Sequence, residues 1–192
     1  MAAEQRPAAF VDRDGVINEE LDYVHRVEDF HLLPGVPEGL RRLAAAGYAL
    51  VVVTNQAGMA KGLYDEVTYQ ALTAQMRALL AGHGVVLTDV YHCPHHPEGS
   101  VPALARDCDC RKPAPGMLLR AAAEHDLDLS RSVMVGDKTS DTQAGRAAGV
   151  AWTILVESGH ALPADALDHA DHRCADLAEA ARWICARPAS NT

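Results

Sequence analysis

The fold of this chain is decided by the stretch Ala8-Ala9-Phe10-Val11-Asp12-Arg13-Asp14-Gly15. Its first four residues are apolar and have the length of a strand, and two aspartates follow closely. In an open sheet of parallel strands, ligands bind beyond the carboxyl ends of the strands. The sequence therefore predicts a strand over 8–11 that delivers Asp12 and Asp14 to a ligand site, with Gly15 allowing a sharp turn. Because Asp and Gly are common in solvated turns, this motif alone leaves a plain turn open.

Further apolar runs with the composition of strands cover 49–53, 88–91, 132–135 and 152–156. None of them has a polar face, which is typical of parallel strands covered by helices on both sides. Amphipathic helical patterns alternate with these runs, and the last of them covers 176–187. This alternation predicts an α/β protein with a doubly wound, mainly parallel, Rossmann-like sheet of five or six strands.

Length and composition indicate an ordinary globular protein. The chain has 192 residues, of which 48% are hydrophobic and 22% are charged, and these values exclude a disordered or fibrous chain. A length of this size suits one domain with a full hydrophobic core. We expect a single domain over 1–188, an inserted loop over 93–112 and a tail over 189–192.

The charge balance and the absence of long apolar runs argue against several classes of binding partner. The formal net charge is −9, from 17 Lys and Arg against 26 Asp and Glu, which makes nucleic acid and anionic membranes poor partners. No stretch approaches about 18 uninterrupted apolar residues, and the N-terminus lacks a secretory signal. We therefore expect a cytoplasmic monomer that acts on a small molecule.

Polar side chains follow the predicted strands where those strands end. Thr54 comes after the second strand, and Asp137 and Lys138 come after the fourth. Lys112 precedes the helix marked by Pro115, which brings a cation to the same edge. Carboxylates from two strand ends can hold Mg²⁺, while Thr54 and Lys112 can neutralise phosphoryl oxygens. The pattern predicts a site that binds Mg²⁺ and a phosphoryl group.

In type and order these residues resemble the four motifs of the haloacid dehalogenase-like hydrolases, from about residue 8 to 156. The resemblance implies the fold of the haloacid dehalogenase-like hydrolases. It implies no large cap domain, since the segment 18–34 is too short to form one. It also implies that Asp12 is the nucleophile and Asp14 the general acid and base. Thr54 and Lys112 would stabilise the phosphoryl group, and Mg²⁺ would bind Asp12, Asp137 and the main-chain carbonyl of Asp14.

A narrower resemblance rests on the motifs at 51–56, 91–97, 108–113 and 135–138. They are similar to those of the heptose-bisphosphate phosphatase family and of the related zinc-containing histidinol-phosphate phosphatases. The resemblance implies hydrolysis of the 7-phosphate of a heptose 1,7-bisphosphate, and histidinol phosphate remains the alternative substrate. It places substrate contacts on Arg13, Glu20, Leu21, Asp22, Tyr23, Asn55, Gln56, Ala57, Arg111 and Lys138.

A second motif carries a metal site of another kind. The five cysteines are an odd number without a secretion signal, which argues against a disulfide framework. Three thiolates and one imidazole suit tetrahedral, structural Zn²⁺, and the motif supplies them as Cys93, His95, Cys108 and Cys110. Reduced thiols in a loop, or His96 as the fourth ligand, stay open. Because Arg111 and Lys112 follow Cys110 directly, we expect the metal to position both cations.

Two other classes of function also stay open. A zinc-loop binding module with an inert sheet would use the Cys/His motif without catalysis, although the net charge and the strand-end residues count against it. A phosphotransferase would pass the phosphoryl group from Asp12 to an acceptor other than water. Loss of phosphate release on substitution of Asp12 separates an enzyme from a binding module.

Overall fold

The computed structural model describes residues 5–162, 165 and 169–187. The tail expected over 189–192 lies outside these residues. One sheet of six strands runs through the molecule in the order β3-β2-β1-β4-β5-β6, and every neighbouring pair is parallel. The strands are β1 (Ala8–Val11), β2 (Ala49–Asn55), β3 (Asp89–Cys93), β4 (Val133–Gly136), β5 (Trp152–Val156) and β6 (His172–Cys174). The prediction of a doubly wound α/β fold is confirmed.

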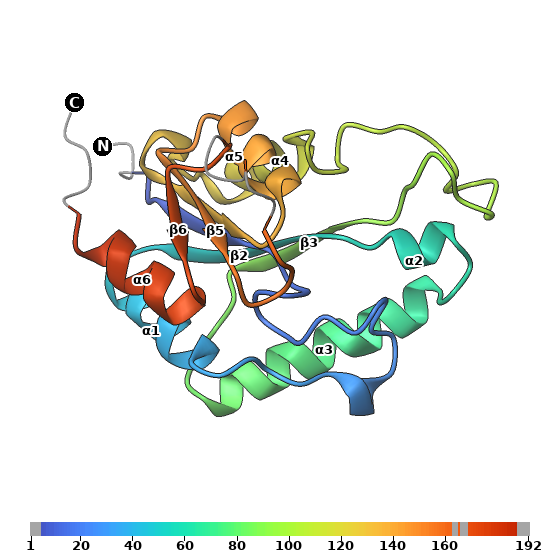
Figure 1. Cartoon of the computed structure of the whole chain (residues 1–192), viewed down its shortest axis with the longest axis horizontal. Helices are drawn as coiled ribbons and strands as arrows, with labels where there is room; N and C mark the ends of the chain where they lie inside the picture. Colours follow the sequence, from blue (N-terminus) through green and yellow to red (C-terminus); the bar gives the residue numbers. More distant parts are fainter. Residues whose placement is uncertain (1–4, 163–164, 166–168, 188–192) are drawn as a thin grey trace.

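Helices cover both faces of the sheet (Figure 1). The α-helices are α1 (Val36–Ala45), α2 (Ala57–Ala60), α3 (Glu66–Gly82), α4 (Gly116–His125), α5 (Thr139–Ala148) and α6 (Leu177–Cys185). Two short 3₁₀ helices lie at Val27–Asp29 and Leu129–Arg131. Asp65 caps α3 by accepting a hydrogen bond from the Thr68 amide, and Asp176 caps α6 through the Glu179 amide.

Alternate residues of β1, β2 and β4 enter two separate hydrophobic clusters. On one face, Val11 and Val52 pack with apolar residues of α1, α3 and α6. On the other face, Phe10 and Val51 pack with residues of α4 and α5. This alternation follows from the two-residue period of a strand. Both faces of the sheet are therefore buried, which explains why the strands read as continuous apolar runs.

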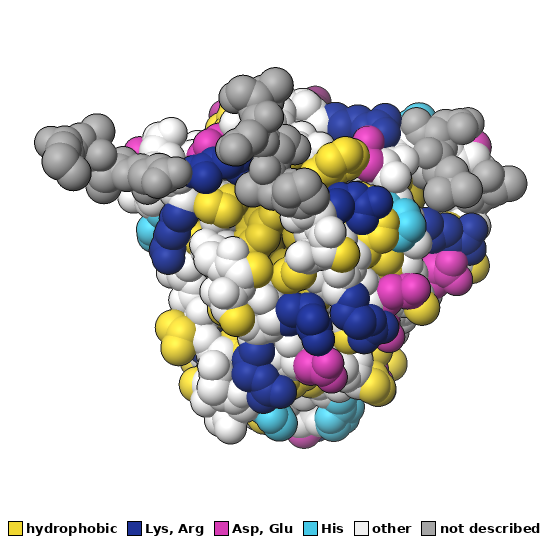
Figure 2. Space-filling view, turned by 90° about the vertical axis from the view of Figure 1, so that its left-hand side faces the viewer, with side chains coloured by type: hydrophobic (Ala, Val, Ile, Leu, Met, Phe, Trp, Pro, Cys, Tyr) yellow, Lys and Arg dark blue, Asp and Glu magenta, His cyan; other side chains and the backbone are white. Residues whose placement is uncertain are grey.

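The edge strand β6 was not predicted from the sequence. It has three residues, of which Arg173 is exposed, so it carries no run of apolar residues that marks a strand. The face beside it, where α6 and α1 lie, presents arginine side chains among hydrophobic ones (Figure 2), and Arg41, Arg42 and Arg182 of these two helices are exposed. There the Arg187 guanidinium lies 3.2 Å from the centre of the Trp183 ring. No helix in the described part of the chain is long and apolar enough to cross a membrane.

The strand order brings three strand ends together. Since β1 lies between β2 and β4, the residues that follow these strands meet at one edge of the sheet. The long connection after β3 extends outward from that edge in Figure 1, beside α2. The fold thus leaves a concave site between the strand ends and the two long connections.

Candidate active site

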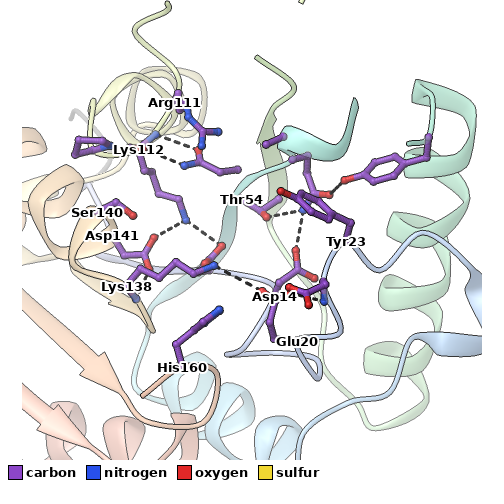
Figure 3. A pocket seen from close by; sticks show the side chains of 17 residues that line it. Asp14, Glu20, Tyr23, Thr54, Arg111, Lys112, Lys138, Ser140, Asp141 and His160 are labelled. Atoms are coloured by element: carbon purple, nitrogen blue, oxygen red, sulfur yellow. Dashed lines mark hydrogen bonds and ion pairs between the residues drawn. The ribbon is translucent and has the colours of Figure 1, made fainter. Parts of the chain in front are cut away.

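A pocket of about 420 Å³ opens at the carboxyl ends of β1, β2 and β4 (Figure 3). All four residues expected to be catalytic line it: Asp12, Asp14, Thr54 and Lys112. Asp12 and Thr54 are only 6% and 1% exposed, so little water competes for them. The structure therefore gathers side chains that stand up to 100 residues apart in the sequence (12 to 112).

Asp12 and Lys112 form a buried ion pair. The Nζ of Lys112 lies 2.9 Å from Asp12 Oδ1 and 2.7 Å from Asp141 Oδ1, and it donates to the carbonyl of Val53 at 2.8 Å. Burial raises the pKa of Asp12 to about 7, although Lys112 opposes that rise. Burial alone would lower the pKa of Lys112, but Asp12 and Asp141 together raise it above its usual value. Lys112 therefore carries a permanent positive charge beside Asp12.

Asn55 positions Lys112 through its backbone. The Asn55 side chain donates to the Lys112 carbonyl at 3.0 Å and accepts from the Lys112 amide at 3.0 Å. Both functional groups of this amide are thus used inside the protein. Asn55 lines the pocket as expected, and its observed contacts are to the loop that carries Lys112.

The carboxylate of Asp14 is surrounded by hydrogen-bond donors. Arg13 reaches both of its oxygens, and its Nη2 lies 2.8 Å from Oδ1 and 2.9 Å from Oδ2. Asn18 donates to Oδ1 at 3.0 Å and Gln56 donates to Oδ2 at 2.9 Å. Burial would raise the pKa of Asp14, but Arg13 and the other donors hold it below its usual value. Arg13 itself is 1% exposed and lies outside the lining of the pocket.

A cluster of buried carboxylates fits a divalent cation. Oxygens of Asp12, Asp137 and Asp141 lie within 4.8 Å of one another. Asp137 Oδ1 is buried without a hydrogen-bond partner. Burial is the main cause that raises the pKa of Asp137, and the nearby charge of Asp141 is the second. An oxygen-preferring ion such as Mg²⁺ would satisfy that oxygen and offset the charge repulsion. Both oxygens of Asp141 are bonded, Oδ1 to Lys112 and Oδ2 to the Lys138 amide. The contacts of Asp12 with Lys112 and the Arg13 amide use Oδ1 alone, and Asp137 Oδ1 has no partner, so Asp12 and Asp137 are the better ligands.

Gly15 allows the close approach of this cluster to the turn after β1. Its φ is +83°, and a Cβ at this position would lie 2.5 Å from Asp137 Oδ2. A side chain there would collide with the carboxylate expected to bind the metal. The turn therefore needs glycine for its backbone conformation and for the space it leaves.

Most of the residues expected to contact substrate lie on the pocket wall. The wall contains Glu20, Asp22, Tyr23, Asn55, Gln56, Ala57, Arg111 and Lys138. Leu21 is 52% exposed and, like Arg13, does not line the pocket. Glu20 and Lys138 form an ion pair of 3.6 Å, which links the connection after β1 to the end of β4.

Five residues that line the pocket are not among the site residues predicted from the sequence: Tyr64, Pro113, Ser140, Asp141 and His160. His160 follows β5, and its Nδ1 lies 2.5 Å from Asp137 Oδ2. The rule that ligands bind beyond strand ends applies to β5 too, so it could have identified His160. Ser140 and Asp141 belong to the first turn of α5, directly after Lys138. No sequence pattern of this kind identifies Tyr64, because it lies in the connection between α2 and α3 and not at the end of a strand.

The Cys/His motif also comes together in space. Ligand atoms of Cys93, His95, Cys108 and Cys110 lie within 4.8 Å of one another. His96 instead uses its Nδ1 to accept from the Glu98 amide, so it is not part of this cluster. Three sulfurs and one imidazole nitrogen form a donor set that suits Zn²⁺. The cluster could hold zinc with four protein ligands and no open position.

Comparisons with known proteins agree with this geometry. A family model described as HAD-hydrolase-like matches residues 109–180. The D-glycero-beta-D-manno-heptose-1,7-bisphosphate 7-phosphatase of Escherichia coli K12 is 45% identical, over 93% of this chain and 95% of that protein. An enzyme of Photorhabdus laumondii that is named for the alpha anomer is 47% identical, over 79% of this chain and 83% of that protein.

Solved structures lead to the same family. The D,D-heptose 1,7-bisphosphate phosphatase from B. bronchiseptica, complexed with magnesium and phosphate, superposes with a TM-score of 0.78 at 34% identity. The match covers 93% of this chain and 97% of that one. This chain belongs to the haloacid dehalogenase-like hydrolases, in the family of the heptose-bisphosphate phosphatases, and it is a Mg²⁺-dependent phosphatase that works through an aspartyl-phosphate.

Proposed function

We propose that this enzyme removes the 7-phosphate of D-glycero-D-manno-heptose 1,7-bisphosphate. The observation that carries this proposal is the buried contact of 2.9 Å between Asp12 and Lys112, at the floor of a pocket lined by further cations. A carboxylate beside a fixed ammonium suits attack on a phosphate monoester, because the ammonium neutralises the phosphoryl oxygens. The choice of sugar is supported by relatives that match nearly the whole chain.

In the first step, a carboxylate oxygen of Asp12 attacks phosphorus and the bond from phosphorus to the sugar oxygen breaks. Asp14, once protonated, gives its proton to the departing oxygen; the donors that lower its pKa favour the carboxylate that remains. In the second step, water attacks phosphorus, Asp14 takes a proton from it, and the bond from phosphorus to Asp12 breaks. Covalent catalysis thereby divides one difficult displacement into two easier ones.

Side chains around Asp12 stabilise the charge in both steps. Lys112 and the hydroxyl of Thr54 face the position of the phosphoryl oxygens. Mg²⁺ would be held by Asp12, Asp137 and the main-chain carbonyl of Asp14, and it would supply further positive charge there. Arg13 acts by holding Asp14, because it lies too deep in the protein to reach the substrate.

Arg111 and Lys138 suit the part of the substrate that stays outside. Both line the pocket, and Lys138 is paired with Glu20, whose carboxylate can accept from sugar hydroxyl groups. The second phosphate of a bisphosphate offers these cations an anionic partner. Histidinol phosphate offers a cationic amine instead, so this arrangement favours the bisphosphate.

A substrate panel tests this preference. We expect kcat/KM for heptose 1,7-bisphosphate to exceed that for histidinol phosphate by about 100-fold, because the second phosphate is bound by charge-assisted hydrogen bonds. Phosphate release should be measured on both heptose anomers and on histidinol phosphate, with Mg²⁺ and without it. Equal or faster release from histidinol phosphate would reverse the assignment of substrate.

We also propose that Cys93, His95, Cys108 and Cys110 hold a structural Zn²⁺. The guanidinium of Arg111 donates to the carbonyl of His95 at 3.3 Å, so the loop that carries the metal ligands also orients this cation. Lys112 has independent supports in Asn55 and Val53. Zinc therefore acts more on substrate binding than on the chemical step.

Removing the zinc should raise KM with a smaller effect on kcat. For Cys108→Ser we expect KM to increase about tenfold and kcat to change less than about threefold, because Arg111 loses its anchored loop while Lys112 keeps its contacts. Zinc content and steady-state kinetics should be measured together. Cys185→Ser, which lies on α6 outside the cluster, serves as the matched control. A zinc-free variant with unchanged KM would contradict the proposal that zinc supports substrate binding.

We also propose that the protein is cytoplasmic and monomeric. None of the five cysteines forms a disulfide, which suits a cytoplasmic, reducing environment. The single domain over 1–188 with the loop insertion at 93–112 stays a prediction, and sedimentation of the purified protein tests the oligomeric state.

A further inference from the structure

Tyr64 lies in the wall of the pocket, with its ring held on both sides. It is 9% exposed, and its ring lies so close to Gly58 that a Cβ there would be 2.3 Å from Tyr64 Cε1. On another side the ring is parallel to that of His25, with 5.9 Å between the ring centres. The hydroxyl points to Gln56 and donates to its Oε1 at 2.6 Å. The position of this hydroxyl is therefore set by packing.

All polar atoms of the Gln56 side chain have partners inside the protein. Its Oε1 accepts from Tyr64, and its Nε2 donates to Thr54 Oγ1 at 2.8 Å and to Asp14 Oδ2 at 2.9 Å. A carboxylate can only accept, so the nitrogen of the amide must face Asp14. The hydrogen bonds then run in one direction, from Tyr64 through Gln56 to Asp14.

We propose that Tyr64 is a positioning residue for the reaction: through Gln56, its hydroxyl orients the carboxylate of Asp14 toward the leaving oxygen. This inference rests on the proposed function, in which Asp14 protonates that oxygen. The other donors to Asp14, Arg13 and Asn18, come from the same turn after β1. Gln56 instead follows β2, so its hydrogen bond fixes the orientation of the Asp14 carboxylate relative to the rest of the pocket.

The identity of the leaving group separates positioning from a merely structural role. In the first step the P–O bond breaks, its electron pair goes to the leaving oxygen, and an alkoxide takes the proton of Asp14 as it forms. A 2,4-dinitrophenolate is stable as an anion at neutral pH and leaves without that proton. Loss of Asp14 positioning therefore slows hydrolysis of an alkyl phosphate and not of 2,4-dinitrophenyl phosphate.

The test is Tyr64→Phe, which removes the hydroxyl and keeps the ring. We expect kcat/KM for the sugar phosphate to fall about tenfold and that for 2,4-dinitrophenyl phosphate to change less than about twofold, because one buried hydrogen bond in the network is lost. The ratio kcat/KM reports the steps up to formation of the aspartyl-phosphate. Equal losses on the two esters would show that Tyr64 only shapes the pocket and would overturn the proposal.

Two further variants control this test. Tyr91→Phe loses a hydrogen bond of the same length, 2.6 Å to Glu124, on the edge strand β3, and should change neither rate more than about twofold. Adding Tyr64→Phe to Gln56→Met should cause no further loss, because both act along one chain of hydrogen bonds. An additive loss in the double variant would overturn the proposal.

Failure of the proposed function would look different. A wild-type protein that hydrolyses neither ester overturns that function and, with it, the role of Tyr64. A wild-type protein that hydrolyses both esters, with a Tyr64→Phe variant equal to it on both, overturns only the role of Tyr64. Thermal unfolding of Tyr64→Phe within a few degrees of wild type confirms that the variant is folded.

Discussion

Asp12→Asn should abolish phosphate release, with kcat falling about 10⁴-fold or more, while the protein stays folded. An amide of the same shape cannot form the acyl phosphate, so neither step of the reaction is available. The fold should tolerate this change, because Asp12 shares its buried site with Asp137 and Asp141. Removing one of three neighbouring negative charges relieves repulsion in the absence of metal.

Phosphate release and thermal unfolding should be measured side by side. Asp126→Asn is a matched control, since Asp126 ends α4 in the left-handed region at φ 52°, where Asn is well tolerated. A variant at position 12 that keeps more than about a hundredth of the wild-type kcat would mean that Asp12 is not the nucleophile. Trapping the acyl phosphate of the wild type, and comparing free with transferred phosphate, separates hydrolysis from phosphotransfer.

Lys112→Met should reduce kcat by about 10³-fold. The ammonium faces two carboxylates and the expected position of the phosphoryl oxygens, and Met fills a similar volume without charge. Burial already raises the pKa of Asp12 to about 7, and Lys112 is the group that opposes this rise. Without Lys112 the pKa of Asp12 goes higher, so less of the nucleophilic carboxylate is present at neutral pH.

The pH dependence of this variant gives a second readout. A carboxyl with a raised pKa holds its proton in competition with Mg²⁺, so the Mg²⁺ concentration needed for half-maximal kcat should fall between pH 7 and 9 more steeply in Lys112→Met than in wild type. Mg²⁺ titrations of kcat at several pH values measure this. A loss of less than about tenfold, with the wild-type pH dependence, would show that Lys112 does not contribute charge to the reaction.

Much of the site could be predicted because its residues follow strands. The apolar runs before Asp12, Thr54 and Asp137 are long enough to be recognised, and parallel strands present their carboxyl ends on one edge. The prediction was poorer for β6, whose three residues include an exposed arginine. A short edge strand depends on its pairing with β5 and leaves no pattern of its own.

The roles of individual polar side chains depended on distances that no local pattern contains. Arg13 stands between two pocket aspartates in the sequence, yet its guanidinium is buried against Asp14. Asn55, like Thr54, lies at the end of β2, but its side-chain amide is hydrogen-bonded to the backbone of Lys112. Asp141 and Tyr64 are connected to the site through Lys112 and Gln56, contacts that only the folded chain creates.

By itself, the sequence determined the parallel α/β architecture and the edge of the sheet where the chemistry lies. Strand periodicity and the residues after each strand are local properties, and a parallel sheet turns them into a common location. The tertiary structure alone decided which donor faces which carboxylate, and thus how Asp12, Asp14 and Asp137 differ in charge and orientation. The reason is that hydrogen bonds and burial act over a few ångströms in space, whatever the separation of their residues along the chain.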